Sequence, residues 1–196
     1  MKKIFLLSTL IFLSVQCKAQ SNIVALTNCD KQYDHSTGDY YLKDTADKMN
    51  KYSGVWKWTS GNREFILTLI KQVKHHYNQY GNNNYYKDRL IGYYQYKENG
   101  LLIADTSSDD LSKDYESRVI FNLGCNSHIS AISFEDYKKY KNFDVTLENI
   151  SPTQIKMKMF ETEHIITVNK HTGVRNPPND PQGGSTFPME MVLTKQ

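Results

Sequence analysis

The sequence predicts an all-β protein, an antiparallel up-and-down meander that closes into a barrel of eight to ten strands. From Gly54 onward apolar and polar residues alternate with a period of two, which is typical of strands with one buried face. Short turn sequences separate these segments, and no stretch is long enough for the helical crossover that parallel neighbours require. A long meander must split into a sandwich or close, and closure removes its exposed edges.

An export signal occupies the N-terminus. Lys2 and Lys3 precede an apolar run from Ile4 to Val15, which is too short to span a bilayer as a helix. Cleavage after Ala19, with residues 1–19 as the signal peptide, and a lipoprotein-type cut before Cys17 both fit the sequence "LSVQCKAQ". We therefore expect an exported protein that is periplasmic, anchored in the outer membrane through Cys17, or extracellular.

Charge and size limit the class of protein. Removing residues 1–19 takes away three lysines and no acid, so the 24 basic residues fall to 21, against 21 acidic residues. A formally neutral chain lacks the basic stripe of a nucleic-acid-binding protein, and we expect no nucleic-acid partner. The length suits a single domain. We expect a monomer that meets a membrane only through a lipid on Cys17.

Two cysteines, Cys29 and Cys125, remain after either cleavage. An oxidising compartment permits them to form a disulfide. The bond would enclose roughly a hundred residues and stabilise the fold by about 4.5 kcal/mol on the chain-entropy model. Two unpaired thiols are the other interpretation.

Residues 20–53 lack a sustained apolar period, so we expect an extended N-terminal arm before a barrel of residues 54–196. Within the arm, "DTADKMNKY" (44–52) can hold one helical turn, with Asp44 or Thr45 as its cap.

The expected strands follow one another through short turns. Val55 to Ser60 is the first, Gly61-Asn62 suits a two-residue hairpin turn, and Arg63 to Val73 returns. Residues 136–142 are expected to form a short helix, and a Pro/Gly-rich loop runs over 171–184. The remaining expected strands are 85–97, 101–106, 117–124, 129–134, 143–149, 153–160, 163–170 and 186–195. Pro188 fits the last of these because it lies near the beginning of the strand.

The alternation nominates the side chains that point into the barrel. Lys156 and Lys158 alternate with methionines and face outward. The inward set is Leu90, Tyr94, Tyr96, Val119, Phe121, Leu123, Val145, Leu147, Ile155, Met157, Met159, Met189, Met191 and Leu193.

A Gly-x-Trp sequence begins the first strand. A tryptophan there can cover the closed end of a barrel, and a glycine two residues earlier permits a tight backbone approach to its ring. The stretch "YSGVWKW" (52–58) resembles the first-strand motif of lipocalins and fatty-acid-binding proteins. The resemblance implies a lipocalin-like barrel with Gly54 and Trp56 at its floor. The Gly61-Asn62 turn leaves no room for the helical lid of fatty-acid-binding proteins.

The whole chain also resembles an uncharacterised family of small exported lipocalin-like proteins of Bacteroidota, a domain of unknown function. The resemblance runs through "CKAQ", "YYLKDTADKMNKYSGVWKW", "YYKDRLIGYY" and the terminal "FPMEMVLTKQ". It implies export and a barrel, and it supplies no activity.

Metal-ligand and catalytic patterns are weak. His75 and His76 would point to opposite sides of a strand, so we interpret them as surface or turn histidines and expect no metal and no cofactor. The stretch "DTSSDDLSKDYE" (105–116) has acids at calcium-loop spacing, but Asp110 stands where the sharp turn needs glycine. A solvated acidic loop is the simpler interpretation. No hydrolase motif is present, so no catalytic residue is nominated and we do not expect an enzyme.

The favoured function is binding of a small apolar or amphipathic ligand inside the barrel. Inward methionines adapt to an irregular ligand, but they equally fill a narrow barrel. His164 shares a face with Ile166 and Val168, and either binds a ligand or is hydrogen-bonded in the core. The candidate ligand-binding residues are Tyr94, Tyr96, Phe121, Met157, Met159, His164 and Met191.

The alternative function is that of a cell-envelope interaction protein with a filled barrel. Seven of the fourteen tyrosines lie between residues 77 and 96. Tyrosine suits half-buried strands, and it also forms stacking platforms for sugars or peptides. In this interpretation the 77–96 segment or the 171–184 loop contacts a glycan or another protein.

Overall fold

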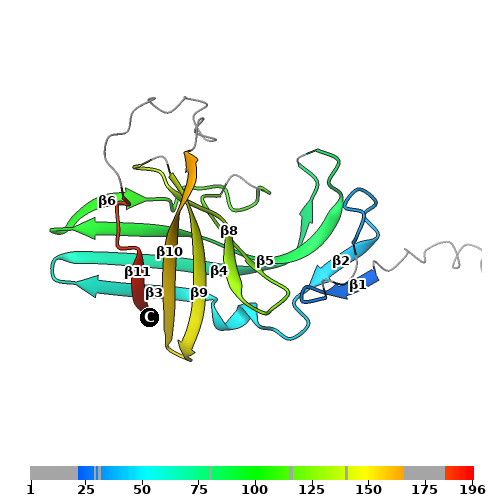
Figure 1. The fold of residues 1–196 in the computed structure, drawn as a ribbon, viewed down its shortest axis with the longest axis horizontal. Coiled ribbons are helices and arrows are strands. Elements are labelled where there is room, and N and C mark those ends of the chain that lie inside the picture. The colour runs from blue at the N-terminus through cyan, green and yellow to red at the C-terminus, as the bar shows by residue number, and fades with distance from the viewer. Residues whose placement is uncertain are drawn as a thin grey trace, which may run out of the picture.

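Eight antiparallel strands close into a barrel in the computed structural model, which describes residues 22–28, 30, 32–79, 81–114, 117–139, 141–165 and 184–196 (Figure 1). The barrel strands are β3 (Gly54–Ser60), β4 (Arg63–Tyr77), β5 (Tyr85–Glu98), β7 (Val119–Leu123), β8 (Ile129–Asp136), β9 (Lys141–Ser151), β10 (Gln154–Ile165) and β11 (Glu190–Lys195). Each pairs with the next, and β11 returns to β3. The predicted all-β, up-and-down barrel is confirmed. The described residues contain one helix, the short 3₁₀ helix η1 (Met49–Lys51).

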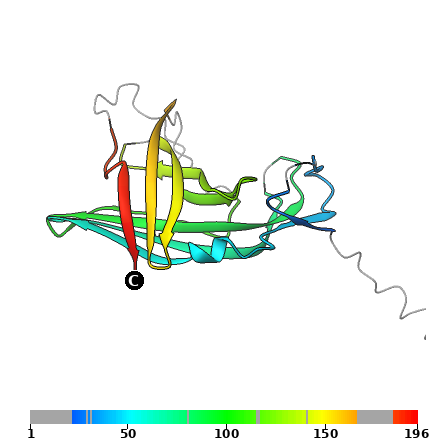
Figure 2. The ribbon, with the colours of Figure 1, turned by 60° about the horizontal axis from the view of Figure 1, so that its bottom comes forward.

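Strand β5 is the element on which several neighbours converge. One edge pairs with β4 along nearly its whole length. The other edge pairs in turn with β2 (Tyr40–Lys43), with β7 and with β6 (Leu101–Asp105). Figure 2 shows β9, β10 and β11 crossing steeply over the long β4–β5 hairpin, with β7 and β8 beside them.

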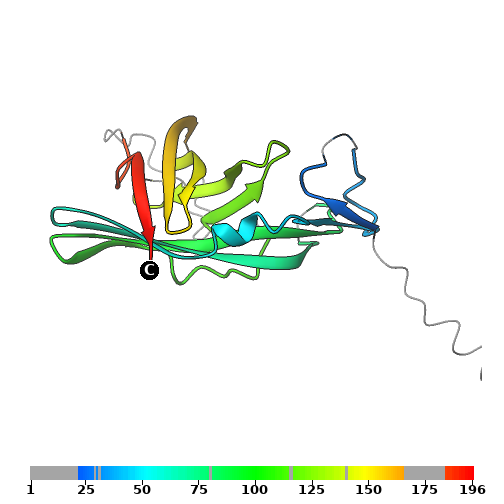
Figure 3. The same ribbon diagram turned by 90° about the horizontal axis from the view of Figure 1, so that it is seen from below.

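A small extension projects beyond the barrel. It comprises β1 (Asn22–Ala25), β2, residues 74–77 of β4 and residues 85–88 of β5. Strand β1 pairs with β2 in parallel, and β2 pairs with β5 in parallel. The expected extended arm therefore contains two strands that lengthen the sheet, and Figure 3 shows this extension standing apart from the barrel strands.

Barrel closure depends on a close approach at Gly92. In β5 this residue pairs with Leu69 of β4 on one side and with Val119 of β7 on the other. A Cβ atom at position 92 would lie 1.8 Å from the backbone oxygen of Thr68. Only glycine fits here, which is typical of the sharp bends that close barrels.

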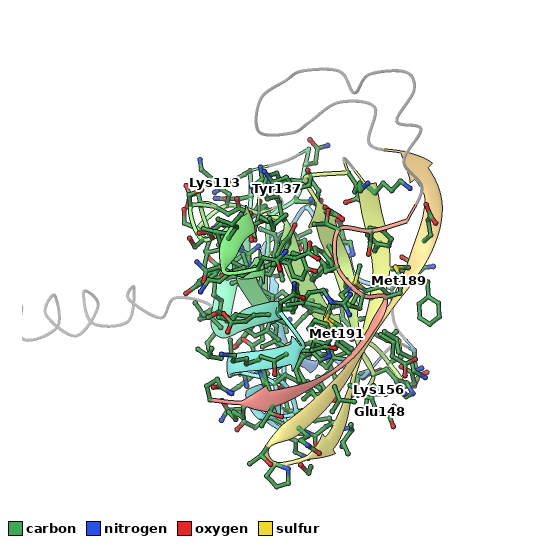
Figure 4. The ribbon with its side chains drawn as sticks, turned by 90° about the vertical axis from the view of Figure 1, so that its left-hand side faces the viewer. Lys113, Tyr137, Glu148, Lys156, Met189 and Met191 are labelled. Atoms are coloured by element: carbon green, nitrogen blue, oxygen red, sulfur yellow. The ribbon has the colours of Figure 1, made fainter. Side chains whose placement is uncertain are left out.

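The predicted inward residues form the core. All of the nominated side chains are buried except Met189, which is partly buried and packs against the same cluster. In Figure 4 Met191 lies on the barrel side of β11, whereas Lys156 and Glu148 lie together on the outside of β10 and β9. Lys156 and Glu148 are partners in the pairing of β10 with β9, so their side chains lie on the same face.

Two predicted connections between barrel strands are wrong. Residues 153–160 and 163–170 were expected to form two separate strands, but β10 continues without a break to Ile165 because its pairing with β9 extends past Glu161. Residues 136–142 were expected to form a helix. Instead β8 ends at Asp136, whose carboxylate accepts the backbone N–H groups of Lys138 and Lys139 and so fixes a turn.

The final strand also begins later than expected, at Glu190. Pro188 lies before the paired residues, where its missing N–H costs no ladder hydrogen bond.

Trp56, which the resemblance to lipocalins predicts at the barrel floor, lies in the core. Its indole is fully buried, and Nε1 donates a hydrogen bond of 2.7 Å to the backbone oxygen of Tyr52. The Nζ of Lys195 lies 5.1 Å from the ring centroid. Gly54 has a φ of 128°, and a Cβ there would lie 2.9 Å from Cε of Lys195. The glycine therefore makes room for the lysine that lies over the indole, rather than for the indole itself.

The two tryptophans give a matched test of this floor. Trp56→Ala should lower the free energy of unfolding by about 3–5 kcal/mol, because it removes a fully buried ring. Trp58→Ala should cost less than half as much, since Trp58 is only partly buried at the edge of the core. Urea denaturation followed by circular dichroism measures both values. Equal losses for the two variants would contradict the assignment of Trp56 as the floor.

Candidate functional site

The candidate ligand-binding residues of the barrel pack against one another. Tyr94, Tyr96, Phe121, Met157, Met159 and Met191 belong to one buried cluster, and none is more than 4% exposed. The Tyr94 hydroxyl donates to the backbone oxygen of Glu135 at 2.8 Å. The side chain of His164 lies outside the described residues. The structure thus brings six of the seven candidates together as a packed core.

Phe187, which the sequence reasoning did not nominate, fills the middle of this core. Its ring centroid lies 5.0 Å from that of Phe65, 5.1 Å from that of Tyr94 and 6.0 Å from that of Phe134. The buried carboxylate of Asp136 anchors the segment by accepting the N–H of Thr186 at 2.6 Å and its hydroxyl at 2.8 Å. Phe187 lies two and four positions before Met189 and Met191. The same alternation that predicts these methionines to point inward therefore also indicates an inward position for Phe187.

The extension carries a different kind of surface on each face. On one face, which we call the tyrosine face, Tyr40, Tyr77 and Tyr85 form a second buried cluster. The rings of Tyr77 and Tyr85 stack with centroids 5.0 Å apart, and those of Tyr40 and Tyr85 are 5.9 Å apart. Burial raises the pKa of Tyr40 to about 12, so its hydroxyl stays protonated.

The opposite face, which we call the platform face, consists of Ile23, Tyr41, His76, Tyr86 and Lys74. The first four form one row across the sheet, because Ile23 pairs with Tyr41, Tyr41 with Tyr86, and Tyr86 with His76. The His76 and Tyr86 rings stack at 4.5 Å with an interplanar angle of 18°. Ile23 is 54% exposed, and His76 and Tyr86 are half-buried.

A β-bulge aims Lys74 at this row. The pairing of β4 with β5 shifts between Gln72 and His75, and Lys74 adopts a φ of 54°. Its N–H donates to Oδ1 of Asp88 at 2.8 Å, which holds the bulge in place. The Nζ of Lys74 consequently lies 5.1 Å from the Tyr86 ring centroid and 5.8 Å from that of Tyr41. Bulges commonly redirect a side chain in this way near binding sites.

A buried carboxylate network connects the extension to the 3₁₀ helix η1. Asp88 accepts hydrogen bonds from the Tyr41 hydroxyl at 2.5 Å and from the N–H of Asp44 at 2.9 Å. Burial, and then the Asp88 hydrogen bond, raise the pKa of Tyr41. Asp44 in turn accepts the N–H groups of Lys48 and Met49 at the start of η1. The N-cap position of η1 is Lys48, so Asp44, one of the two predicted caps, binds these N–H groups from four residues before that position.

The loop of residues 106–114 is clamped onto the tyrosine face by Arg89. This buried guanidinium donates to the backbone oxygens of Leu111, Lys113 and Asp114 and lies 5.4 Å from the Tyr77 ring centroid. His75 Nε2 lies 2.8 Å from Oδ1 of Asp114. His75 and His76 thus lie on opposite faces of the strand.

The described residues of the acidic loop, 105–114, use their carboxylates in local hydrogen bonds and one ion pair. Asp105 accepts the N–H of Ser107, Asp110 accepts that of Ser112, and Asp109 pairs with Arg118. Glu116 lies outside the described residues. In the described part of the chain no three His, Cys, Asp or Glu side chains gather closely enough to hold a metal ion.

Cys125, in the exposed turn between β7 and β8, is disulfide-bonded. Cys29 lies outside the described residues, so its pairing with Cys125 stays a prediction, as does the lipidation of Cys17. The His171–Gly184 loop also lies outside them, apart from Gly184.

These features define a class: an up-and-down eight-stranded barrel with a packed interior and an appended four-stranded extension. The chain belongs to a family of unknown function (DUF6705), whose model matches residues 1–196. Neither the curated proteins nor the solved structures gave a match to the chain. No helix among the residues described here is long and apolar enough to cross a membrane.

The Asp88 network can be tested by removing its carboxylate. Asp88→Ala should lower the free energy of unfolding by about 2 kcal/mol or more, because a buried hydroxyl and two backbone N–H groups lose their acceptor. Asp110→Ala is the matched control, since Asp110 is exposed and accepts only from Ser112; its effect should stay below about 0.5 kcal/mol. Guanidinium denaturation gives both values. A neutral Asp88→Ala variant would contradict the role assigned to the network.

Proposed function

We propose that the protein is an exported cell-envelope binding protein that engages an acidic glycan with the platform face of the extension. The observation that carries the proposal is the contrast between the two candidate surfaces. The barrel candidates are packed around Phe187, whereas on the platform face Lys74 and Ile23 are exposed, His76 and Tyr86 are half-buried, and Tyr41 alone is buried. The barrel serves in this proposal as the rigid support of the extension.

The chemistry of the platform face suits a sugar ring with a carboxylate. Tyrosine and histidine rings offer flat apolar area with polar edges, on which the C–H face of a sugar stacks. Asn84 fixes the orientation of His76 through a bond of 2.8 Å to its Nε2. Ile23 adds exposed apolar area at the end of the row.

Lys74 supplies the charge for such a ligand. It is exposed, and its ammonium group forms no ion pair with any of the described residues; it lies instead over the two tyrosine rings. This long side chain can swing to a carboxylate and leave the Tyr86 ring to the sugar. A charge-assisted hydrogen bond to a carboxylate is stronger than a neutral one.

Export is supported by the N-terminal sequence and by the disulfide at Cys125, since disulfides persist in oxidising compartments. The hypothesis of a small apolar ligand inside the barrel has less support, because aromatic rings occupy the space between the candidate residues. It remains a prediction.

The proposal predicts binding of oligogalacturonate to the mature protein by isothermal titration calorimetry. Tyr86→Ala and Lys74→Gln should each weaken binding about tenfold or more, which corresponds to about 1.4 kcal/mol. Tyr93→Ala is the control, because this half-buried tyrosine lies on β5 within the barrel, away from the platform face.

Methyl-esterified oligogalacturonate should bind more weakly than the acid, because it lacks the charge that Lys74 recognises. The proposal fails if the wild-type protein binds neither form, or if Tyr86→Ala binds the acid as tightly as the wild type does.

A further inference from the structure

A small cavity lies at one end of the barrel, on other elements than the platform face. Lys51, Asn149, Pro152 and Lys195 line it, and its volume is about 280 Å³, at the lower end of the range of ligand pockets. Figures 1 and 2 show η1, the turn between β9 and β10 and the end of β11 next to one another at this end. Three segments distant in sequence thus form a cavity with room for a small ligand.

Lys195 is held in this cavity by two contacts. It has the same parity along β11 as the buried residues Met191 and Leu193, so it points toward the barrel end rather than to the outside. Its Nζ lies 5.1 Å from the Trp56 ring centroid, and a Cβ on Gly54 would lie 2.9 Å from its Cε. The missing side chain of Gly54 therefore makes room for a cation over the indole.

The two ammonium groups of the cavity are available to an anion. Neither Lys51 nor Lys195 forms an ion pair or a side-chain hydrogen bond with any residue that the structure describes. Lys51 is exposed and Lys195 is half-buried. The cation–π contact of Lys195 leaves the outward side of its ammonium group free to donate.

The chain around the cavity carries little negative charge. Glu148 is the one acidic residue in the three segments that form the cavity, and it is exposed on the outer face of β9 beside Lys156 (Figure 4). Asp47, just before η1, pairs with Lys71 instead. The three segments lie wholly within the described part of the chain and cover residues 49–57, 147–157 and 191–196.

Asn149 and Pro152 complete the lining with a polar and an apolar group. Asn149 is half-buried, and its Nδ2 donates to the backbone oxygen of Ser151 at 3.2 Å. An amide nitrogen carries two hydrogens, so the second remains for a ligand. The ring of Pro152, in the turn between β9 and β10, offers an exposed apolar wall.

We propose that this cavity binds a phosphate group, held by Lys51 and Lys195 with the Asn149 amide as a further donor. A phosphate monoester carries a charge of about −1.5 to −2 at pH 7, which two ammonium groups match. Charge-assisted hydrogen bonds to its oxygens supply the affinity. Pro152 and the lysine stems contact the organic group attached to the phosphate. The phosphate belongs either to a small soluble ester or to a lipid headgroup.

Isothermal titration calorimetry of glycerol 3-phosphate into the mature protein tests the site. Lys51→Gln and Lys195→Gln should each weaken binding about tenfold or more. Lys57→Gln is the matched control, because it removes the same charge from β3, where Lys57 pairs with Glu64 on the face opposite Trp56. Equal affinities of the Lys51→Gln and Lys57→Gln variants would overturn the proposal.

Stability and the platform face are controlled separately. Lys195→Gln also takes the cation away from the Trp56 ring, so circular dichroism first establishes that this variant folds. Lys51→Gln changes an exposed side chain and decides the outcome alone if Lys195→Gln is unfolded. Lys74→Gln, which should weaken glycan binding, should leave the affinity for glycerol 3-phosphate unchanged. A loss in Lys74→Gln equal to that in Lys51→Gln would place the phosphate elsewhere and refute the site.

Trp56 gives a readout within the cavity. The chain has two tryptophans, so Trp58→Phe leaves Trp56 as the only one. An anion bound to Lys195 alters the charge over the indole, and the Trp56 fluorescence should change with the same affinity that calorimetry measures. A calorimetric signal without a change in Trp56 fluorescence would contradict binding at this site.

Vesicles distinguish the two sources of the phosphate. Phosphatidic acid presents a phosphate monoester, whereas phosphatidylcholine does not. Stronger co-sedimentation with phosphatidic acid vesicles, reduced in Lys51→Gln, identifies a lipid headgroup as the ligand. Calorimetric binding of glycerol 3-phosphate with no preference between the vesicles identifies a soluble ester. If the wild-type protein neither binds glycerol 3-phosphate nor prefers phosphatidic acid, the proposal is wrong.

Discussion

The hydrogen-bonding edge of β5 that faces away from β4 determines the arrangement of the whole protein. A strand of fourteen residues shares this edge among β2, β7 and β6, in that order along the chain. Pairing with β7 closes the barrel, and pairing with β2 creates the extension. The barrel and the extension therefore share one edge of β5. Neither β7 nor β2 can shift along this edge without displacing the other strand.

The interior of the barrel is packed because the enclosed side chains are large. Eight strands leave room for little more than their own side chains, and large aromatic rings use that room. Phe65, Tyr94, Phe134 and Phe187 contact one another at the ring distances typical of aromatic pairs. The inner surface thus stabilises the fold, and the binding surface that we propose lies on the extension, where polar groups meet aromatic rings at half-buried positions.

The local sequence pattern was sufficient to predict the barrel. It did not predict how the core is completed or that an extension is attached to the barrel. Period-two alternation identified inward residues such as Phe121 and Met157, because one buried face imposes that period directly. For Phe187 it gave only the parity shared with Met191, since this residue precedes the paired part of β11 and its neighbour Thr186 is bound by Asp136, fifty positions away from Thr186. The parallel strands β1 and β2 were missed for a similar reason, because short strands in a polar segment depend on partners distant in sequence. The bulge at Lys74 depends on the Asp88 carboxylate, which the spacing of residues does not disclose.

The absence of a side chain at Gly92 has a consequence for how this chain can vary in length. The position must face the oxygen of Thr68 at the point where β5 meets β7, so the register of β4 against β5 is fixed to the residue. One residue inserted into either strand between this point and the extension, without a compensating bulge like the one at Lys74, would reverse which faces the tyrosines occupy. We therefore expect changes in length to be tolerated in the connection of residues 78–84, outside both strands, because an insertion there leaves the two faces of the extension as they are.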